Sequence, residues 1–336
     1  MTGARGHRRP GAAATVALLC AVTAAGLYGC SGSGPSEPKP HPTPTPAPAT
    51  SKPATPVPSG LSPLTGLPAK PGRVLAVKID NVPPARPHTG LDAADLVYVE
   101  QVESGQTRLM AVYSSHLPAR VGPVRSARES DLALLRQYGT PVLAYSGAQS
   151  KLTPLLRAAP LHLVSEGNHP GAFLRDPARS APHNLYLRPA RALATAPDAS
   201  KVKDVGFRFG PATGGGTPVN SRTVRFPAAR YTFTWAPAEH AWHVAMDGRS
   251  DGPLKPATVV VQHVTVRSSR FHDFLGAVSP YTVTVGKGTA QVLRDGRVYE
   301  ARWSRPTADA GTVFTTPSGA RLTFAPGQVW VLFTKA

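Results

Sequence analysis

The chain has 336 residues and a formal net charge of +18, from 37 Lys and Arg against 19 Asp and Glu. Its length is enough to bury one or two ordinary hydrophobic cores. It has 2 cysteines, and Cys20 lies in an apolar segment that export would remove. A fold stapled by disulfides is therefore excluded, and the mature protein must be stabilised by packing.

The first thirty residues have the three parts of a secretory signal. Three arginines lie within the first nine residues, and an apolar run follows from 12 to 27. This run is shorter and weaker than a membrane-spanning helix, which needs about 20 apolar residues. It ends in Leu27-Tyr28-Gly29-Cys30, which resembles the lipobox that is cut before a lipidated cysteine, although Tyr28 is larger than usual.

We therefore expect residues 1–30 to be a lipoprotein signal with Cys30 as the lipidated residue. Two acyl chains, palmitate among them, would hold the protein stably on a membrane. The expected location is the extracellular face of the cell membrane, within the cell envelope. The alternative is an ordinary secretory signal with an incidental cysteine.

Residues 31–60 contain ten prolines among Thr, Ala, Ser and Lys, as in PTPTPAPAT. Proline fixes φ and removes backbone donors, so the segment favours polyproline II over packed structure. Fully extended, it would reach roughly 90 Å. We interpret it as a disordered spacer that holds the folded part away from the membrane; low complexity without a length requirement is equally compatible.

Loss of the three signal arginines leaves a mature charge of about 18 − 3 = +15. Basic exported proteins meet phospholipid headgroups, phosphate-bearing wall polymers and peptidoglycan carboxylates. Nucleic acid is not expected, because of the compartment and because aromatic residues do not alternate with Lys or Arg. An arginine-rich composition that needs no partner is the alternative.

Within an expected domain of residues 61–215, strand and helix patterns alternate from about 73 to 166, which is typical of a mixed sheet with helices packed on it. In Val74–Asp80, Leu75, Val77 and Ile79 share one face. The other expected elements are strands at 95–103, 107–114, 141–145 and 161–165, a hairpin turn at 104–106, and helices at 130–138 and after an N-cap at Thr153. The Pro- and Gly-rich chain that follows, to about 216, is expected to be irregular.

Residues 216–336 favour a mostly antiparallel β domain. Asp247-Gly248 and Asp295-Gly296 lie between alternating apolar segments, the strongest short signal for a hairpin. Strands are expected at 223–225, 231–235, 242–246, 258–266, 281–285, 290–293, 298–303, 321–324 and 329–333. The fold class is therefore α+β, with an N-terminal mixed α/β domain followed by the β domain.

Several motifs resemble the YerB-like lipoproteins, a family with a domain of unknown function. They are SPLTGLPA near Ser62, VKIDN at Val77–Asn81, RPHTGLDAADLVYVE at Arg86–Glu100, TRLMAVYSS from Thr107, VGPVRSAR at Val121–Arg128, APHNLY at Ala181–Tyr186, the strand Val259–Val264, and PGQVWVLF from Pro326. The resemblance implies a lipoprotein with an N-terminal mixed domain and a C-terminal β domain. It implies no chemistry.

The densest group of candidate ligand-binding residues is basic. It contains Arg108, Arg120, Arg125 and Arg128, with Ser126 between the last two. Guanidinium forks match carboxylate and phosphate oxygens, so several converging arginines would form an anion site. Alternatively, Arg125 and Arg128 pair with Glu100, Glu103 or Asp131 in a structural network.

Asp80 and Asn81 end a predicted strand, where open α/β sheets bind ligands. We expect them to line the same cleft together with Glu100, His183 and Asn184.

Catalytic patterns are weaker. Asp80 could pair with Glu100 across neighbouring strands, and His183 could act as a base beside Ser146, but no nucleophile elbow is present. Residues 200–203 match S-x-x-K without its companion motifs, and the histidines lack the spacing of a metal site.

The sequence therefore predicts a membrane-anchored binding module without cofactor or metal, and whether it is also an enzyme stays open. The expected partners are the membrane, an anionic wall polymer, peptidoglycan or a membrane protein. The rival is a peptidoglycan-acting enzyme that uses Asp80 or Glu100 as general acid or base. A third possibility is a scaffold for a membrane-bound partner, which would show a large apolar patch on the β domain.

Overall fold

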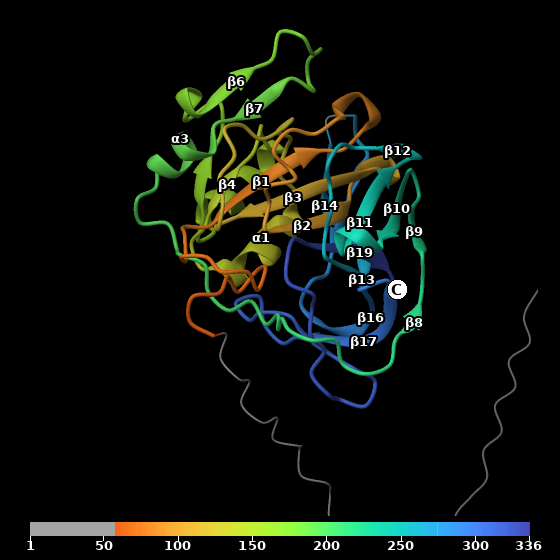
Figure 1. The fold of residues 1–336 in the computed structure, drawn as a ribbon. Coiled ribbons are helices and arrows are strands. Elements are labelled where there is room, and N and C mark those ends of the chain that lie inside the picture. The colour runs from red at the N-terminus through yellow and green to blue at the C-terminus, as the bar shows by residue number, and fades with distance from the viewer. Residues whose placement is uncertain (1–57, 274) are drawn as a thin grey trace, which may run out of the picture. The chain divides into compact units, whose positions relative to one another are not determined.

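The computed structural model describes residues 58–273 and 275–336. The signal, Cys30 and nearly all of the spacer lie outside the described residues. Strands dominate the described chain, and the three α-helices have only six or seven residues each (Figure 1). The helices are α1 (Glu129–Leu135), α2 (Thr153–Ala158) and α3 (Pro189–Ala194).

The strands fall into two groups along the chain. The first comprises β1 (Leu75–Asp80), β2 (Leu96–Gln101), β3 (Thr107–Tyr113), β4 (Val142–Ala144), β5 (His162–Val164), β6 (Phe173–Arg175) and β7 (Leu185–Leu187). The second comprises β8 (Thr217–Pro218), β9 (Ser221–Phe226), β10 (Ala229–Ala236), β11 (Ala241–Met246), β12 (Arg249–Ser250), β13 (Thr258–Val264), β14 (Val266–His272), β15 (Val278–Thr282), β16 (Gly286–Arg294), β17 (Arg297–Arg305), β18 (Val313–Thr315) and β19 (Val329–Lys335).

One sheet contains strands of both groups. Its order is β18-β17-β16-β13-β19-β2-β3-β1-β4-β5, with β8 paired to β17. The last strand, β19, lies between β13 and β2 and is parallel to both. The division into domains at 61–215 and 216–336 stays a prediction, but the two parts share this sheet.

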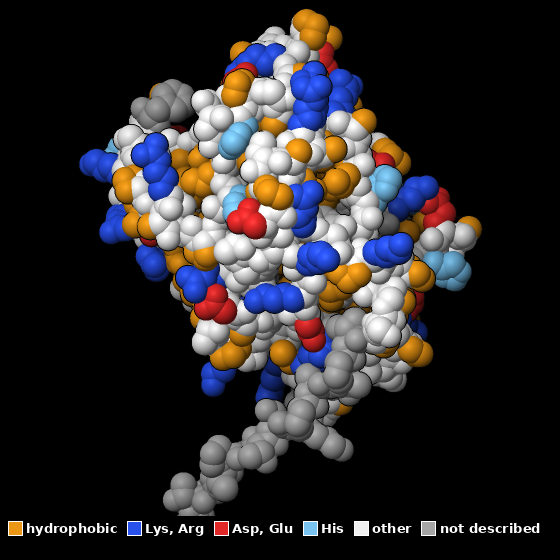
Figure 2. All heavy atoms as spheres, turned by 90° about the vertical axis from the view of Figure 1, so that its left-hand side faces the viewer, with side chains coloured by type: hydrophobic (Ala, Val, Ile, Leu, Met, Phe, Trp, Pro, Cys, Tyr) orange, Lys and Arg blue, Asp and Glu red, His pale blue; other side chains and the backbone are white. Residues whose placement is uncertain are grey.

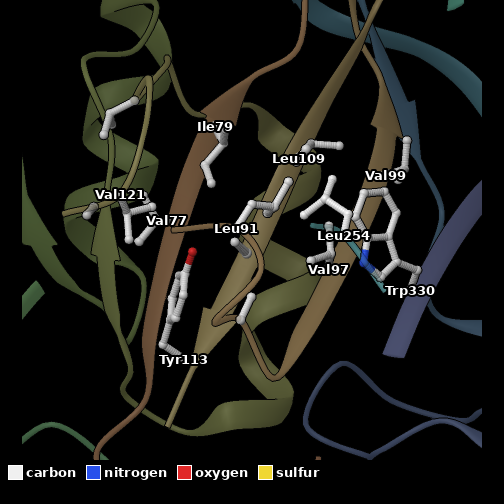
Figure 3. Packing of buried hydrophobic residues seen from close by; sticks show 14 of the residues in the cluster. Val77, Ile79, Leu91, Val97, Val99, Leu109, Tyr113, Val121, Leu254 and Trp330 are labelled. Atoms are coloured by element: carbon white, nitrogen blue, oxygen red, sulfur yellow. The ribbon is translucent and has the colours of Figure 1, made fainter. Parts of the chain in front are cut away.

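The sheet is apolar on both faces. On one face, Val77, Ile79, Leu109 and Val97 pack with Trp330 of β19 (Figure 3). On the other face, a second cluster includes Leu134 and Leu135 of α1 and Leu156 of α2. Because both faces are covered, strands in the middle of the sheet bury most of their side chains, and β1 is buried at all six positions.

A second sheet, β12-β11-β10-β9, packs over the first of these faces. Tyr231 and Phe233 of β10 meet the ring of Trp330 edge-on, at centroid distances of 6.4 and 6.0 Å. Both predicted Asp-Gly hairpins are confirmed, β11–β12 in this second sheet and β16–β17 in the first. Asp247 and Gly248, and Asp295 and Gly296, all have positive φ, which the two-residue turn requires.

Most predicted elements are confirmed to within a few residues, but four predictions are wrong. The chain from 166 to 216 is not irregular, since it contains β6, β7 and α3. Thr153 is the first residue of α2 rather than its N-cap. The predicted strand 258–266 is two strands, β13 and β14, and 321–324 makes only isolated bridges. The missed elements have two to seven residues, too few for a clear hydrophobic period.

We expect Trp330→Ala to destabilise the fold by about 3–5 kcal/mol, because the ring is fully buried between the two sheets. Urea denaturation followed by circular dichroism measures this change. Leu275→Ala, at a side chain that is 78% exposed, is the control and should stay within about 0.5 kcal/mol. Equal stabilities of the two variants would contradict this packing.

Candidate functional site

The centre of the site is a row of charged residues across three strands. Arg108 of β3 pairs with Asp80 of β1 on one side and with Glu100 of β2 on the other. Strand β3 therefore separates the two acids, and the predicted direct pairing of Asp80 with Glu100 across neighbouring strands is wrong. Each carboxylate has a different basic partner.

Glu100 belongs to a buried charge cluster with Lys78 and Asp131. The Lys78 ammonium binds Glu100 Oε2 and lies 2.6 Å from Asp131 Oδ1, and all three side chains are at most 1% exposed. Asp131 also accepts a hydrogen bond from the backbone N–H of Arg128, at 2.7 Å, so it caps α1 and binds Lys78 at once. The buried charge cluster thus joins β1, β2 and α1.

One ammonium faces two carboxylates in this cluster. Burial raises the pKa of Glu100, and the negative charge of Asp131 adds to this effect; Lys78 offsets both in part, and the pKa is about 7. Burial acts to lower the pKa of Lys78, but the two acids outweigh this effect, and the pKa is raised. Lys78 is therefore charged at neutral pH, while Glu100 exchanges its proton near neutrality.

Arg128 is committed to a structural ion pair. Its guanidinium donates two hydrogen bonds of 2.6 Å to the carboxylate of Glu103, and a third N–H binds the carbonyl of Ala127. Burial acts to raise the pKa of Glu103, but Arg128 and the Ser279 hydroxyl outweigh it and lower the pKa to about 2. For Arg128, the structure thus has the alternative considered from the sequence, a structural ion pair with Glu103.

Arg108 and Arg125 keep most of their donors. Arg108 uses one N–H, which binds the carbonyl of Ser126 at 3.0 Å. Arg125 Nε lies 3.1 Å from Asp80 Oδ2 without hydrogen-bond alignment, and no side-chain N–H of Arg125 is hydrogen bonded within residues 58–273 and 275–336. Of the arginines predicted to form the anion site, Arg108 and Arg125 are thus the two whose guanidinium groups would face a ligand with unused donors.

Both line a pocket of about 940 Å³, which we call the arginine pocket. Its wall consists of Glu103, Ser104, Gln106, Arg108, Arg125, Ser126, Ala127, Arg128, Glu129, Ala148, Gln149, Ser150, Leu152, Phe271, His272, Asp273, Leu275, Gly276 and Ser279. The volume suits a small-molecule ligand or a short piece of a polymer. The pocket thus brings together Arg108, Arg125, Ser126 and Arg128 of the predicted set.

The wall of this pocket does not include Asp80, Asn81 or His183. His183 Nδ1 is 2.8 Å from Asp80 Oδ2, the same oxygen that Arg125 approaches. Asn81 donates from its amide to Thr107, at 2.9 Å, and to the hydroxyl of Tyr231. Asp80 therefore links the hidden polar network to the pocket through Arg125.

Two predicted residues lie elsewhere. Asn184 accepts a hydrogen bond of 2.9 Å from Arg175, and the same guanidinium group also pairs with Glu166. Arg120 lies over the ring of Tyr186, at 5.3 Å from its centroid. Neither Asn184 nor Arg120 lines the arginine pocket.

Sequence reasoning missed Lys78, His88 and Asp251. His88 is fully buried; its Nδ1 binds Asp251, and its Nε2 lies 2.7 Å from the backbone oxygen of Asp80. A lysine in a strand that is otherwise apolar was a usable signal for Lys78. No local pattern indicates the pairing of His88 with Asp251, because the two residues are 163 positions apart.

The chain belongs to a family known by its two domains of unknown function. The family models described as "Protein of unknown function (DUF3048)" match residues 64–203 for the N-terminal domain and 222–331 for the C-terminal domain. The resemblance to YerB-like proteins inferred from the motifs is thus confirmed.

Two comparisons with one known protein, in sequence and in structure, extend this result. The chain is 26% identical over 308 residues to "Putative lipoprotein YerB" of Bacillus subtilis (strain 168), covering 80% of this chain and 85% of that protein. The crystal structure of YerB from Bacillus subtilis matches with a TM-score of 0.69 at 22% identity, over 82% of this chain and 97% of the other. The structural match shows a shared fold, and the name of the relative suggests a lipid anchor.

Within the described ranges, no three or more His, Cys, Asp or Glu side chains are grouped so that they could hold a metal ion. The helices among these residues are too short or too polar to cross a bilayer.

We expect stability to fall as pH rises from about 4.5 to about 7, because folded Glu100 keeps a proton that unfolded Glu100 loses at its ordinary pKa of 4.5. The contribution is complete below pH 4.5 and is lost by about pH 7, at up to about 1 kcal/mol per pH unit. Glu100→Gln should remove this dependence in urea denaturation between pH 4.5 and 8. Glu300→Gln, at an exposed position of β17, should leave it; an unchanged slope in Glu100→Gln would refute the assignment.

Proposed function

We propose that this protein is a binding module of the cell envelope, anchored through Cys30 to the outer face of the cell membrane. Its arginine pocket binds an anionic group, a phosphate or a carboxylate, of an envelope component. The 31–60 spacer sets its reach from the membrane, and the guanidinium groups set the orientation of the ligand.

One observation carries the proposal: two guanidinium groups with unused donors face the same pocket. Arg125 is a quarter exposed and makes no side-chain hydrogen bond within the described chain, although its planar fork could donate two parallel bonds to an oxyanion. Arg108 lies deeper and contributes a second cation.

The electrostatics of Arg108 support an anionic ligand. Its pKa is lowered to about 9, first by burial and then by the positive charges of Arg128 and Arg125, with only partial relief from Glu103 and Asp80. Positive charge is therefore concentrated at Arg108. An oxyanion between Arg108 and Arg125 would reduce the repulsion between these positive charges, and this relief would contribute to the binding free energy.

The sequence and the surface support the envelope location. The lipobox-like ending at Cys30 agrees with the lipoprotein name of the Bacillus relative. On the face seen in Figure 2, Lys and Arg side chains outnumber Asp and Glu and are spread over the surface. A positive exterior favours approach to an anionic layer.

We expect Arg125→Ala to weaken binding of inorganic phosphate by roughly 10- to 100-fold, the range for losing a charge-assisted hydrogen bond. Isothermal titration calorimetry at low salt measures the affinity, and thermal melting checks that the variant is folded. Arg249→Ala, at an exposed position of β12, removes the same charge outside the pocket and should bind normally. Equal affinity of the Arg125 and Arg249 variants would remove the proposal.

Arg128 is not part of the proposed ligand set, because its donors are already used by Glu103 and Ala127. Its role is to hold the loop 125–128 against the turn at Glu103. Loss of this partner would leave Glu103 as a poorly solvated charge, so Arg128→Ala is expected to lower stability before it lowers affinity.

A second candidate function is the peptidoglycan-acting enzyme. The observation in its favour is the pairing of His183 with the buried carboxylate of Asp80 at 2.8 Å, which orients an imidazole that is 19% exposed. A carboxylate that orients the imidazole in this way is found beside the general-base histidine of serine hydrolases. Hydrolysis of purified peptidoglycan that disappears in His183→Ala would favour this function over binding alone.

A scaffold role has less support. The large apolar side chains exposed among the described residues are Leu67, Leu117, Leu275 and Val278, of which two lie on or beside the β14–β15 hairpin. They do not make the large apolar patch that a scaffold for a membrane-bound partner would need.

A further inference from the structure

A second pocket opens on the other side of the turn that carries Glu103. We call it the basic groove; it has a volume of about 430 Å³. It is lined by Gln101, Arg225, Phe226, Pro227, Val266, Arg267, Ser268, Val278, Ser279, Pro280, Thr334 and Lys335. Its walls therefore come from β9, the β14–β15 hairpin and the end of β19.

The basic groove has three cations and no acid in its lining. Arg225, Arg267 and Lys335 are exposed, and none of them forms an ion pair with another residue of the described chain. Arg267 lies over the ring of Tyr281, at 4.1 Å from its centroid, which holds the guanidinium in place without neutralising it. The charge of the groove is thus uncompensated.

The two pockets share a wall. Ser279 lines both, and its hydroxyl binds Glu103, the acid that holds Arg128. The β14–β15 hairpin contributes its base to the groove and residues near its tip to the arginine pocket. The turn between them is tight: at Gly105, with φ of +71°, an added Cβ would lie 2.6 Å from Pro227 Cβ. The two pockets are therefore neighbours, joined at Ser279 and divided by the turn at Glu103 and Gly105.

We infer that the two pockets form one site for a linear polymer that carries phosphate groups at repeated intervals. One phosphate binds between Arg108 and Arg125, and another part of the same chain binds along Arg225, Arg267 and Lys335. The inference rests on the proposed function and names its ligand class.

The geometry favours a chain over a membrane surface. Arg108 is half-buried in a pocket, so lipid headgroups in a planar layer cannot reach it while a flexible strand of polymer can. It also favours a chain over a single anion. Two adjacent cationic sites let the second contact form within one molecule, which raises affinity by about 10²- to 10⁴-fold over one contact.

The experiment compares two soluble probes, orthophosphate and a linear polyphosphate of about ten units, with the 31–336 chain by calorimetry at low salt. We expect the polyphosphate to bind at least about a hundredfold more tightly than orthophosphate. Arg225→Ala/Arg267→Ala should lose most of this gain and bind orthophosphate normally. The matched control is Arg249→Ala/Arg302→Ala, which removes two exposed charges from β12 and β17, outside both pockets, and should keep the gain.

The outcomes separate the two hypotheses. If neither orthophosphate nor a free carboxylate such as glutamate binds, or if their binding does not depend on Arg125, the proposed function fails. If orthophosphate binds through Arg125 but the polymer gains nothing, or both double variants lose the gain equally, only the shared polymer site fails. Equal affinity for polyglutamate would overturn the phosphate assignment, and binding to phosphatidylglycerol vesicles that depends on Arg225 and Arg267 without polymer binding would assign the groove to lipid headgroups.

Discussion

A lysine ammonium without access to solvent is the constraint on which the site depends. Removing ions from water costs several kcal/mol each, and this cost is recovered only if every charge is met at close range. Lys78 satisfies the condition by binding Glu100 of β2 and Asp131 of α1 from its own place on β1. Any shift of the helix or of either strand would leave a charge unpaired, so the three elements have essentially one arrangement.

This arrangement places the loop before α1. Asp131 also receives the backbone N–H of Arg128, so the residue that neutralises Lys78 fixes where the 125–128 loop enters the helix. Glu103 then holds the side chain of Arg128, and Ser126 holds that of Arg108. The arginine pocket is thus built from committed polar contacts, with Arg125 and most of the Arg108 donors left over. A binding site needs this division between groups that hold the frame and groups that remain available.

The shared sheet brings both halves of the chain to the pockets. Because β19 lies between β13 and β2, the C-terminal end of the chain is in the middle of the sheet and its Lys335 borders the basic groove. The groove and the arginine pocket therefore have walls from both halves of the chain. The shared fold with YerB of Bacillus subtilis extends over both halves as well, since the match covers 97% of that structure.

Much of the fold was predictable from local patterns. Alternating apolar residues located β1 and β3, and the two Asp-Gly turns located hairpins of the second half, because side-chain period and turn geometry are properties of a few consecutive residues. The elements β6, β7 and α3 were missed, since three to six residues carry no resolvable period. The alternation in β1 also did not indicate that Lys78 and Asp80, on the face opposite Leu75, Val77 and Ile79, are buried as well.

The sequence by itself determined the expected address and spacer, the strand content, the family, and the choice of arginines as the residues to examine. Only the tertiary structure decided which arginine has its donors bound by protein groups, as Arg128 has, and which keeps donors for a ligand, as Arg125 does. The deciding acids come from distant positions: Glu103 is 25 residues from Arg128, Asp131 is 53 from Lys78, and His183 is 103 from Asp80. A side chain's partner across such distances depends on how the strands are ordered, and nothing in the local pattern encodes that β3 lies between β1 and β2.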